Sequence, residues 1–337
     1  MSETNRVWRL RRRPVGDITD DVLSFDEEAI PEPGDGQFLF RLNYLSLDPT
    51  NRAWMNEGAT YLPAIPIGDP MRGLVCGTVM ASRHPEIAEG DLVSGIGQWA
   101  AYQLGDLASV SKLPDTGPIP VIDAFGVSLV GPTAYFGLLD VGQPKAGETV
   151  VVSAAAGATG SIVGQIAKIH GCRAVGIAGT DEKCRWITDE LGFDAAINYK
   201  TEEIVPSLAR HCPDGIDIYF DNVGGQILDA ALGLINLNAR IVFCGCISAY
   251  NATEPVPGPY NYINILMKRA RLQGFIVLDY MPRYPEALAA LGRWMGEGKI
   301  KHRLEVVDGL EQAGATVRRL FTGDHKGKLM IRVADPA

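Results

Sequence analysis

The segment from Thr149 to Gly164, TVVVSAAAGATGSIVG, constrains the fold of this chain more than any other. The valines at 150–152 are typical of a buried parallel strand, and the small residues after them open a helix. Gly157 would let the backbone approach a pyrophosphate, and Gly160 would let the helix pack closely on the strand. Free N–H groups at such a helix start bind phosphates. The strand–turn–helix setting therefore predicts a dinucleotide site, the alternative being a tight turn without a ligand.

Strand-like and helix-like segments alternate after this motif. The expected strands cover residues 174–178, 195–198, 216–221 and 240–244. Helix-length segments between strands predict a doubly wound parallel sheet with right-handed crossovers, an α/β fold. Ligands of such sheets bind beyond the carboxyl ends of the strands. The tips AAAGATG, AGTDEK, NYK, DNVGG and CGCIS are therefore expected to line one cleft.

The end of the second strand indicates which dinucleotide binds. NAD sites place an Asp or Glu there, on the ribose 2′-hydroxyl. This chain has Gly179 instead, with Lys183 and Arg185 soon after it. The loss of an acid and the gain of cations suit a 2′-phosphate and hence NADP(H), although Lys183 could also lie on a solvated helix face. Asp181 is either a displaced ribose acid or, more simply, a helix N-cap beside Thr180.

The first 120 or so residues differ from this region in composition and pattern. They are rich in Pro and Gly and contain short strand-like runs at 37–42 and 73–80. This pattern predicts an antiparallel, partly open barrel. The tail also ends in a strand, at 327–333, so the outer domain would be discontinuous. We expect a β domain over 1–124, a nucleotide domain over 125–290 and a return to the β domain over 291–337, with the nicotinamide between the two domains.

Composition and charge restrict the class of protein. The formal net charge of −9 disfavours a nucleic-acid binder. The basic run from Arg9 to Arg13 alternates with apolar residues, so we expect it on the exposed face of a first strand. It lacks the apolar core of a signal peptide, and we expect no apolar run that spans a membrane. These features favour a cytoplasmic protein.

Cysteine and histidine patterns give no sign of a metal. The six cysteines include no C-x-x-C pair, and the five histidines are scattered. Reduced thiols and the absence of a metal site are the expectation.

These motifs together make the chain similar to a known family. It resembles the zinc-independent medium-chain dehydrogenase/reductase superfamily, within the group of prostaglandin reductases, leukotriene hydroxydehydrogenases and curcumin reductases, which reduce double bonds with NADPH. The motifs that carry this resemblance are RPVG, LSLDP, AAAGATGSIVGQIAK, GTDEK, INYK, YFDNVGG, CGCISAYN and GF. The resemblance implies a Rossmann domain inserted into a GroES-like β domain. It also implies a homodimer paired through the last strand of each sheet, expected at 272–278.

The resemblance also implies roles for individual residues. Lys183 and Tyr199 would hold the 2′-phosphate, and Asn222 would contact the cofactor. The full set of expected cofactor-binding residues is Ala155, Gly157, Ala158, Thr159, Gly160, Gly179, Thr180, Lys183, Tyr199, Asn222, Cys244, Gly245, Ile247, Ser248, Phe275 and Val277.

Two departures from the family pattern concern the substrate side, and a third, His325, concerns the family's contact to the nicotinamide side of the cofactor. Thr50 and Asn51 stand where relatives usually have Tyr and Met after LSLDP, and His325 stands where many have Asn. The segment MRGLVCG lacks the Gly-His-Glu of zinc-dependent relatives, which argues against zinc alcohol dehydrogenase chemistry.

Reduction of an enone places negative charge on the carbonyl oxygen, and a hydrogen-bond donor must stabilise it. Tyr is a suitable donor because its ordinary pKa near ~10 keeps it protonated at neutral pH. Tyr250, in the ISAYN segment, is the first candidate and Tyr61 the second, whereas Tyr260 and Tyr262 are weaker. The expected activity is NADPH-dependent reduction of α,β-unsaturated ketones or aldehydes. Alternatives are a quinone reductase of the same superfamily and a catalytically silent NADPH-binding protein.

Overall fold

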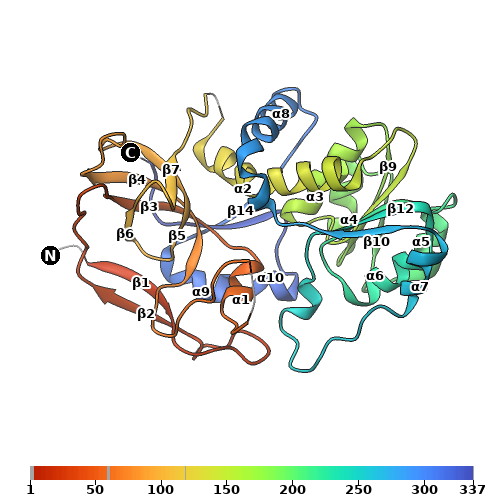
Figure 1. Ribbon diagram of the computed structural model, residues 1–337, viewed down its shortest axis with the longest axis horizontal. Coiled ribbons are helices and arrows are strands. Elements are labelled where there is room, and N and C mark those ends of the chain that lie inside the picture. The colour runs from red at the N-terminus through yellow and green to blue at the C-terminus, as the bar shows by residue number, and fades with distance from the viewer. Residues whose placement is uncertain (1–3, 59–60, 118, 337) are drawn as a thin grey trace. The chain divides into compact units, whose positions relative to one another are not determined.

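The computed structural model describes residues 4–58, 61–117 and 119–336. The chain forms two compact units, one of Met1–Gly126 with Leu304–Ala337 and the other of Val127–Arg303 (Figure 1). The predicted second boundary, at 290/291, therefore differs from the observed one at 303/304. The reason is α8 (Tyr284–Gly296), which buries Leu291 and Trp294 in the core of the second unit.

The second unit is built on a six-stranded sheet of order β10-β9-β8-β11-β12-β13, in which every neighbouring pair is parallel. Its strands are β8 (Thr149–Val152), β9 (Arg173–Ala178), β10 (Ala195–Asn198), β11 (Ile216–Asp221), β12 (Ile235–Phe243) and β13 (Arg271–Gly274). This order confirms the predicted doubly wound α/β fold, because the chain moves outward from β8 in both directions.

Two details of the predicted strands are wrong. β12 begins earlier than expected and ends at Phe243, so Cys244 and Cys246 lie beyond the strand. β13 ends at Gly274, because the chain turns into the short helix η5 (Val277–Arg283) instead of continuing to residue 278.

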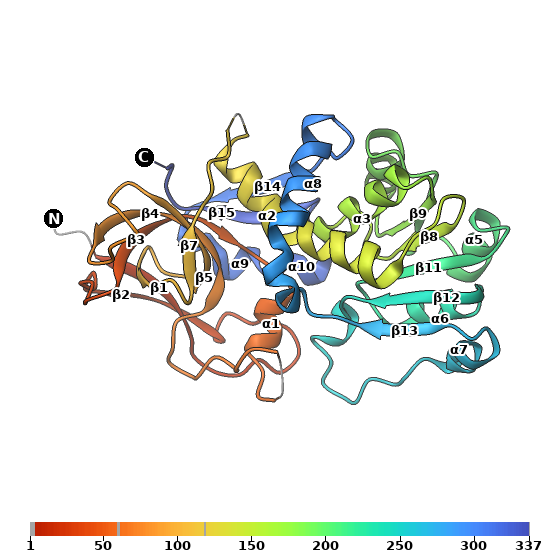
Figure 2. The ribbon, with the colours of Figure 1, turned by 45° about the horizontal axis from the view of Figure 1, so that its top comes forward.

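Helices cover both faces of this sheet (Figures 1 and 2). Val150 and Val152 belong to one buried cluster and Val151 to another, because alternate side chains of a strand point to opposite faces. The helices that contribute to the first cluster are α2 (Val121–Phe136), η1 (Gly137–Gly142), α3 (Ala158–Ile169), η2 (Trp186–Glu190) and α8. The second cluster receives α5 (Ile204–His211), α6 (Gly225–Leu232) and α7 (Ile263–Met267).

The turn between β8 and α3 is closely packed. A Cβ at Gly160 would lie 2.9 Å from the Cα of Ala155 and closer still to the carbonyl oxygen of Ala154, and one at Gly164 would collide with the Phe193 ring. Ala154 itself has a φ of 49°, in the left-handed region that costs a non-glycine residue energy. Only glycine fits where α3 crosses the end of β8, as the motif predicts.

The first unit contains a seven-stranded mixed sheet of order β14-β15-β3-β4-β5-β7, with β6 paired to β3, and a two-stranded sheet. Its strands are β1 (Asn5–Leu10), β2 (Leu23–Glu28), β3 (Phe38–Ser46), β4 (Arg72–Ser82), β5 (Leu92–Gln98), β6 (Tyr102–Gly105), β7 (Val110–Lys112), β14 (Leu304–Asp308) and β15 (Lys328–Arg332). Its short helices are α1 (Thr50–Trp54), η6 (Leu310–Gln312), α9 (Ala313–Thr316) and α10 (Arg319–Thr322).

The C-terminal segment returns to this sheet, since β15 pairs with β3, with Met330 opposite Ser46. The β14–β15 pair is parallel, whereas a wholly antiparallel sheet was expected. β1 ends at Leu10, so Arg9 is the one member of the basic run that lies in a strand.

One helical stretch, Val121–Gly142, is long and apolar enough to cross a membrane by length and composition, with a mean hydropathy of 1.4. The expectation that no apolar run reaches this length is therefore wrong. Half of the stretch is buried inside the protein, as in a packed core helix.

Candidate functional site

The carboxyl ends of five parallel strands meet at one edge of the second unit, as expected for an α/β sheet. At this edge the Asn198 amide donates to Asp181 Oδ1 at 2.6 Å, which links the ends of β10 and β9. The Asn222 amide donates to the Ser153 carbonyl at 2.7 Å, which links β11 to β8. The predicted tips are therefore neighbours in the fold.

The start of α3 supplies the phosphate-binding geometry. Gly157 is its N-cap, so the first turn, from Ala158 to Gly160, has N–H groups without acceptors inside the helix. Ala155 is fully buried and its N–H donates to the Ile177 carbonyl at 3.0 Å. Ala155 therefore shapes the turn and has no N–H to offer to a ligand.

The position directly after β9 is Gly179, so the second tip has no acid there. Thr180 is the N-cap of α4 (Asp181–Arg185) and its hydroxyl accepts from the N–H of Lys183 at 3.2 Å. Asp181 is instead turned toward Asn198. A Cβ at Gly179 would lie 3.1 Å from the Tyr199 ring, and this ring is 43% exposed. Gly179, Lys183 and Tyr199 thus lie at one end of the edge.

The segment after β12 contacts the turn after β11. The N–H groups of Cys244 and Gly245 donate to the Asp221 carbonyl at 2.9 and 3.1 Å. The Ile247 N–H donates to the carbonyl of Asn222 at 3.3 Å. The Ser248 hydroxyl and N–H likewise donate to the carbonyl of Val223, at 2.5 and 3.2 Å. Four predicted cofactor residues of this segment are thereby attached to Asn222 and its neighbours.

Tyr250 ends the short helix η3 (Ile247–Ala249), and its hydroxyl points back along its own segment. The hydroxyl accepts from the Cys246 N–H at 3.5 Å and lies 3.4 Å from where a Cβ at Gly245 would be. Tyr250 therefore lies beside the predicted cofactor segment.

Tyr61 belongs to the first unit. Its hydroxyl forms a hydrogen bond with the Thr50 hydroxyl, and its ring meets Trp54 edge-on at 6.3 Å. The Arg72 guanidinium lies over the same Trp54 ring at 5.5 Å. Thr50, one of the departures from the family pattern, is thus the partner of the second candidate tyrosine.

The remaining predicted residues have other surroundings. Phe275 is partly buried, and its ring meets Tyr280 edge-on at 6.3 Å. Val277 begins η5 and is half-buried. His325 Nδ1 lies 3.2 Å from the Arg319 carbonyl in the first unit.

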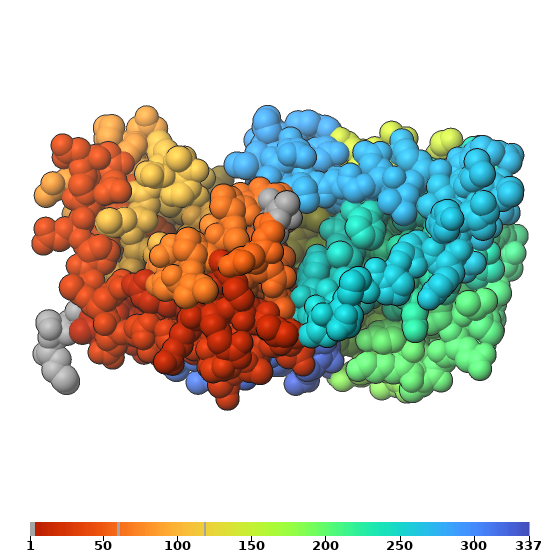
Figure 3. Space-filling model, turned by 60° about the horizontal axis from the view of Figure 1, so that its bottom comes forward, coloured from red at the N-terminus to blue at the C-terminus, as the bar shows by residue number. Residues whose placement is uncertain are grey.

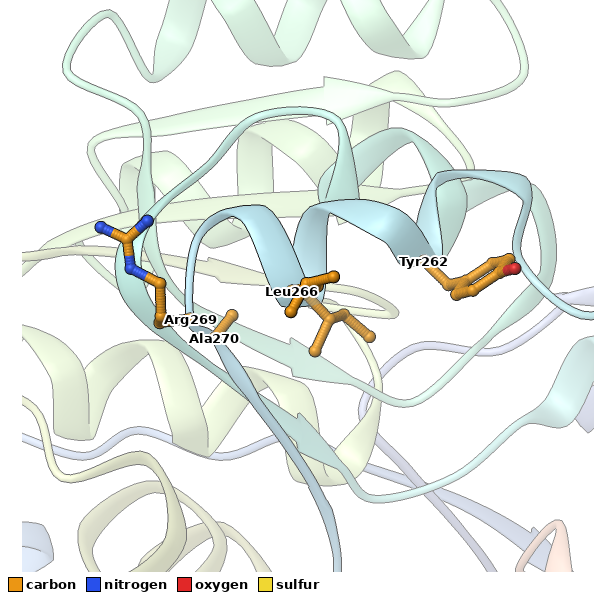
Figure 4. Close-up of a pocket in the computed structure, with 5 residues that line it drawn as sticks. Tyr262, Leu266, Arg269 and Ala270 are labelled. Atoms are coloured by element: carbon orange, nitrogen blue, oxygen red, sulfur yellow. The ribbon is translucent and has the colours of Figure 1, made fainter.

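Tyr260 and Tyr262 lie on an exposed helical turn, 80% and 65% accessible. Tyr262 lines a shallow surface groove with Ile265, Leu266, Arg269 and Ala270 (Figure 4). This groove has one charged residue and shares none with the strand tips, so it is not the candidate catalytic site.

Burial dominates the electrostatics of the edge. It raises the pKa of the Asp221 carboxyl and raises that of the Cys244 thiol to about 12, which keeps this thiol protonated at neutral pH. The described residues contain no group of three or more His, Cys, Asp or Glu side chains that could hold a metal ion. The sequence patterns did not indicate that Ser153, Tyr219 and the Asp221 carboxyl group come together at this edge. The one local signal for such a polar group was the Ser directly after the valines of β8.

Several known protein families and proteins are similar to this chain over most of its length. Residues 6–113 match a family described as the N-terminal domain of oxidoreductase, and residues 158–293 match a family described as zinc-binding dehydrogenase. The chain is 44% identical to the NADPH-dependent curcumin reductase of Escherichia coli, over 98% of each chain. It is 38% identical to prostaglandin reductase 1 of Bos taurus, over 97% of this chain and 98% of that one. The solved structure of CurA from Vibrio vulnificus in complex with NADPH superimposes with a TM-score of 0.92 at 42% identity, over 98% of this chain and all of the other.

Proposed function

Because the chain belongs to the medium-chain dehydrogenase/reductase family, in its group of NADPH-dependent reductases, we propose that it reduces the carbon–carbon double bond of α,β-unsaturated ketones or aldehydes with NADPH. The observation that carries the proposal is the glycine at position 179, directly after β9, where an NAD site has an acid; Lys183 and Tyr199 lie at the same end of the edge.

In this proposal each part of the edge binds one part of the cofactor. Lys183 and the exposed Tyr199 hold the 2′-phosphate, and the first turn of α3 holds the pyrophosphate through its N–H groups. Asn222 and the segment from Cys244 to Ser248 lie beside the rest of the molecule. The hydrogen bonds that join Asn222 to Ser153 support this arrangement, because they fix the amide before a ligand arrives.

Bound NADPH would supply the hydride that the β-carbon of the substrate receives. The protein's part is to orient the substrate and to stabilise the enolate oxygen that develops. Tyr250 is the proposed donor, since its hydroxyl lies against Gly245 and Cys246, in the segment proposed to run beside the cofactor. Tyr61, already bonded to Thr50, is the second candidate. The proposed reaction needs no metal.

The direct test follows the loss of NADPH absorbance with a panel of enones, enals and quinones. Faster turnover of enones and enals than of quinones supports the proposal. Preferential turnover of quinones would favour a quinone reductase. Tight NADPH binding with no turnover of any class would indicate a silent NADPH-binding protein.

We also propose that two copies associate through the exposed edge of β13 and that the protein works in the cytoplasm. All four residues of β13 are exposed, and an open sheet edge readily pairs with another. Figure 3 shows the neighbouring segment, around residues 250–270, as part of the molecular surface. The six cysteines are all unpaired, which suits a reducing compartment.

A further inference from the structure

A buried polar cluster of Asp221, Tyr219 and Ser153, here called the Asp221 cluster, joins the carboxyl ends of β8 and β11. All three residues have 0% exposure. Oδ1 of Asp221 accepts hydrogen bonds from the hydroxyls of Ser153 and Tyr219, each at 3.0 Å. It also accepts from the N–H groups of Val223 at 3.0 Å and Gly224 at 2.9 Å. Four donors therefore converge on one carboxylate oxygen.

The second oxygen of this carboxyl group differs from the first in its hydrogen bonding. Oδ2 of Asp221 is buried and has no hydrogen-bond partner among the described residues. Burying a carboxyl group without a cation costs stability, and an uncharged side chain could close a turn at a lower cost. Because burial of this carboxyl group costs stability, we expect it to have a role beyond packing.

The backbone around the Asp221 cluster carries residues of the candidate site. Asn222 donates to the Ser153 hydroxyl from its N–H at 2.8 Å and to the Ser153 carbonyl from its amide at 2.7 Å. The Asp221 carbonyl accepts from the N–H groups of Cys244 and Gly245. The ends of β8, β11 and β12 are thus tied to one residue, and a shift of Asp221 would move all three.

We propose that Asp221 is a positioning residue of the nucleotide site, whose buried carboxyl group holds Asn222 and the Gly245 backbone in the arrangement that binds NADPH. The inference rests on the proposed function, because it assumes that NADPH occupies this edge. Asp221 acts through its neighbours: with 0% exposure its side chain does not reach a ligand. Tyr219 and Ser153 orient the carboxyl group from two strands.

The chain offers a matched control for this carboxyl group. Asp217 lies in the same strand, β11, and also bridges to β8, since it accepts from the Thr149 N–H at 2.8 Å. It accepts from the Asn236 amide at 2.8 Å as well. Asp217, however, lies at the amino end of the strand, away from the tips. Replacing each Asp by Asn changes the same group at opposite ends of one strand pair.

The experiment compares wild type, Asp221→Asn and Asp217→Asn as full-length proteins. Three quantities are measured: the Kd for NADPH by fluorescence titration, KM for NADPH with kcat, and the melting temperature. We expect Asp221→Asn to raise Kd and KM about tenfold or more while kcat at saturating NADPH changes less. Asp217→Asn should lower the melting temperature and leave Kd unchanged.

Two further variants keep the test decisive if Asp221→Asn does not fold. Ser153→Ala and Tyr219→Phe each remove one donor to Oδ1 and should raise Kd for NADPH in the same direction. A wild-type Kd in Asp221→Asn, or in both donor variants, overturns the proposal, as does an equal rise in Kd for Asp217→Asn. Failure of the wild-type protein to bind NADPH would instead refute the proposed function.

Discussion

At the scale of single residues, cofactor choice depends on the missing side chain at Gly179. An acid there would crowd the Tyr199 hydroxyl, because a Cβ would lie 3.2 Å from it. Without that carboxylate, the edge has no group that favours a free ribose 2′-hydroxyl at this position. Lys183 follows at the start of α4, where the Thr180 hydroxyl caps its N–H, so we expect it to bind the 2′-phosphate without competition from an acid at residue 179.

The first prediction concerns Lys183. Lys183→Ala should raise the Kd for NADPH about tenfold, because a charge-assisted hydrogen bond to a phosphate contributes roughly 1.5–3 kcal/mol. The Kd for NADH should not change, since NADH lacks the 2′-phosphate. Titration of both cofactors measures the two effects. Lys268→Ala, at an exposed lysine after α7, is the control. Equal losses for NADPH and NADH would contradict this role.

The second prediction concerns Tyr250. Tyr250→Phe removes the hydroxyl and keeps the ring, so kcat for enones should fall toward the lower end of the roughly 10²–10³ loss seen when oxyanion donors are removed. NADPH affinity should stay near wild type, because the effect lies on the chemical step. Steady-state kinetics with saturating NADPH measures it, and Tyr262→Phe is the control. If Tyr250→Phe turns over enones at the wild-type rate, Tyr250 is not the hydrogen-bond donor to the enolate oxygen, and Tyr61 becomes the next candidate.

At the scale of elements, the turn from β8 to α3 is the most demanding piece of packing in the site. Gly160 faces backbone atoms that cannot give way, the carbonyl of Ala154 and the Cα of Ala155. A methyl group there would push α3 away from the sheet and move the N–H groups of the proposed phosphate site.

Gly160→Ala should therefore destabilise the protein by about 1–3 kcal/mol and weaken NADPH binding. Gly292→Ala is the matched control, because Gly292 lies in α8 with open space around its Cβ position. That substitution should leave stability unchanged or raise it by about 0.5–1 kcal/mol, the usual gain for Ala in a helix. Denaturant unfolding compares the two. A loss for Gly292→Ala as large as that for Gly160→Ala would contradict the packing argument.

A partly buried ion pair lies at the opposite end of the same sheet. Glu148, before β8, pairs through both oxygens with Arg240 of β12. Burial raises the pKa of Glu148, but the hydrogen bonds from Arg240 and the Lys145 N–H outweigh it, so its pKa is lowered overall. A carboxyl group with a lowered pKa stabilises the fold above its unfolded pKa, near ~4.3, and this stabilisation is lost as pH falls.

Glu148→Gln should therefore lower the melting temperature at pH 7. Between about pH 5 and pH 3 the wild-type protein loses the stabilisation from this ion pair, so the melting temperature of Glu148→Gln should fall less steeply than that of wild type. Thermal unfolding over this range measures both slopes. Glu254→Gln, in an exposed loop, serves as the control and should follow wild type. Parallel curves for wild type and Glu148→Gln would show that the pair does not contribute.

Local sequence patterns predict helices and strands better than they predict which side chains from separate segments come into contact. The β8–α3 motif is readable from the sequence because valines, small residues and glycines act within one short segment. The Asp221 cluster is not readable, since Ser153 and Tyr219 come from different strands and each could be an ordinary core residue. The same limit applies to the boundary at 303/304, which depends on where α8 packs, and to the hydroxyl pair of Thr50 and Tyr61.

At the scale of the whole molecule, the sheet of the second unit has one open edge with apolar residues beside it. β13 pairs with β12 on one side, and its four residues are all exposed. Leu272 on this strand is 40% exposed, and Leu266 and Met267 of the preceding helix are 68% and 58% exposed. An open strand edge with exposed apolar side chains beside it invites pairing with an identical strand around a two-fold axis, because the same patch then covers itself.

The last prediction is therefore a dimer that depends on β13. Light scattering at micromolar concentration should give twice the chain mass of 36.3 kDa. Leu272→Lys places a like charge from each copy on the paired edge and should shift the mass toward the monomer, because facing like charges repel. Val205→Lys is the control: it adds the same charge at a residue of α5 that is 53% exposed, and the mass should stay that of the dimer. A monomeric wild type would exclude the dimer, and a dimeric Leu272→Lys would place the interface on another surface. NADPH affinity measured in the Leu272→Lys monomer then shows whether pairing matters to the nucleotide site, whose tips lie within a single copy of the second unit.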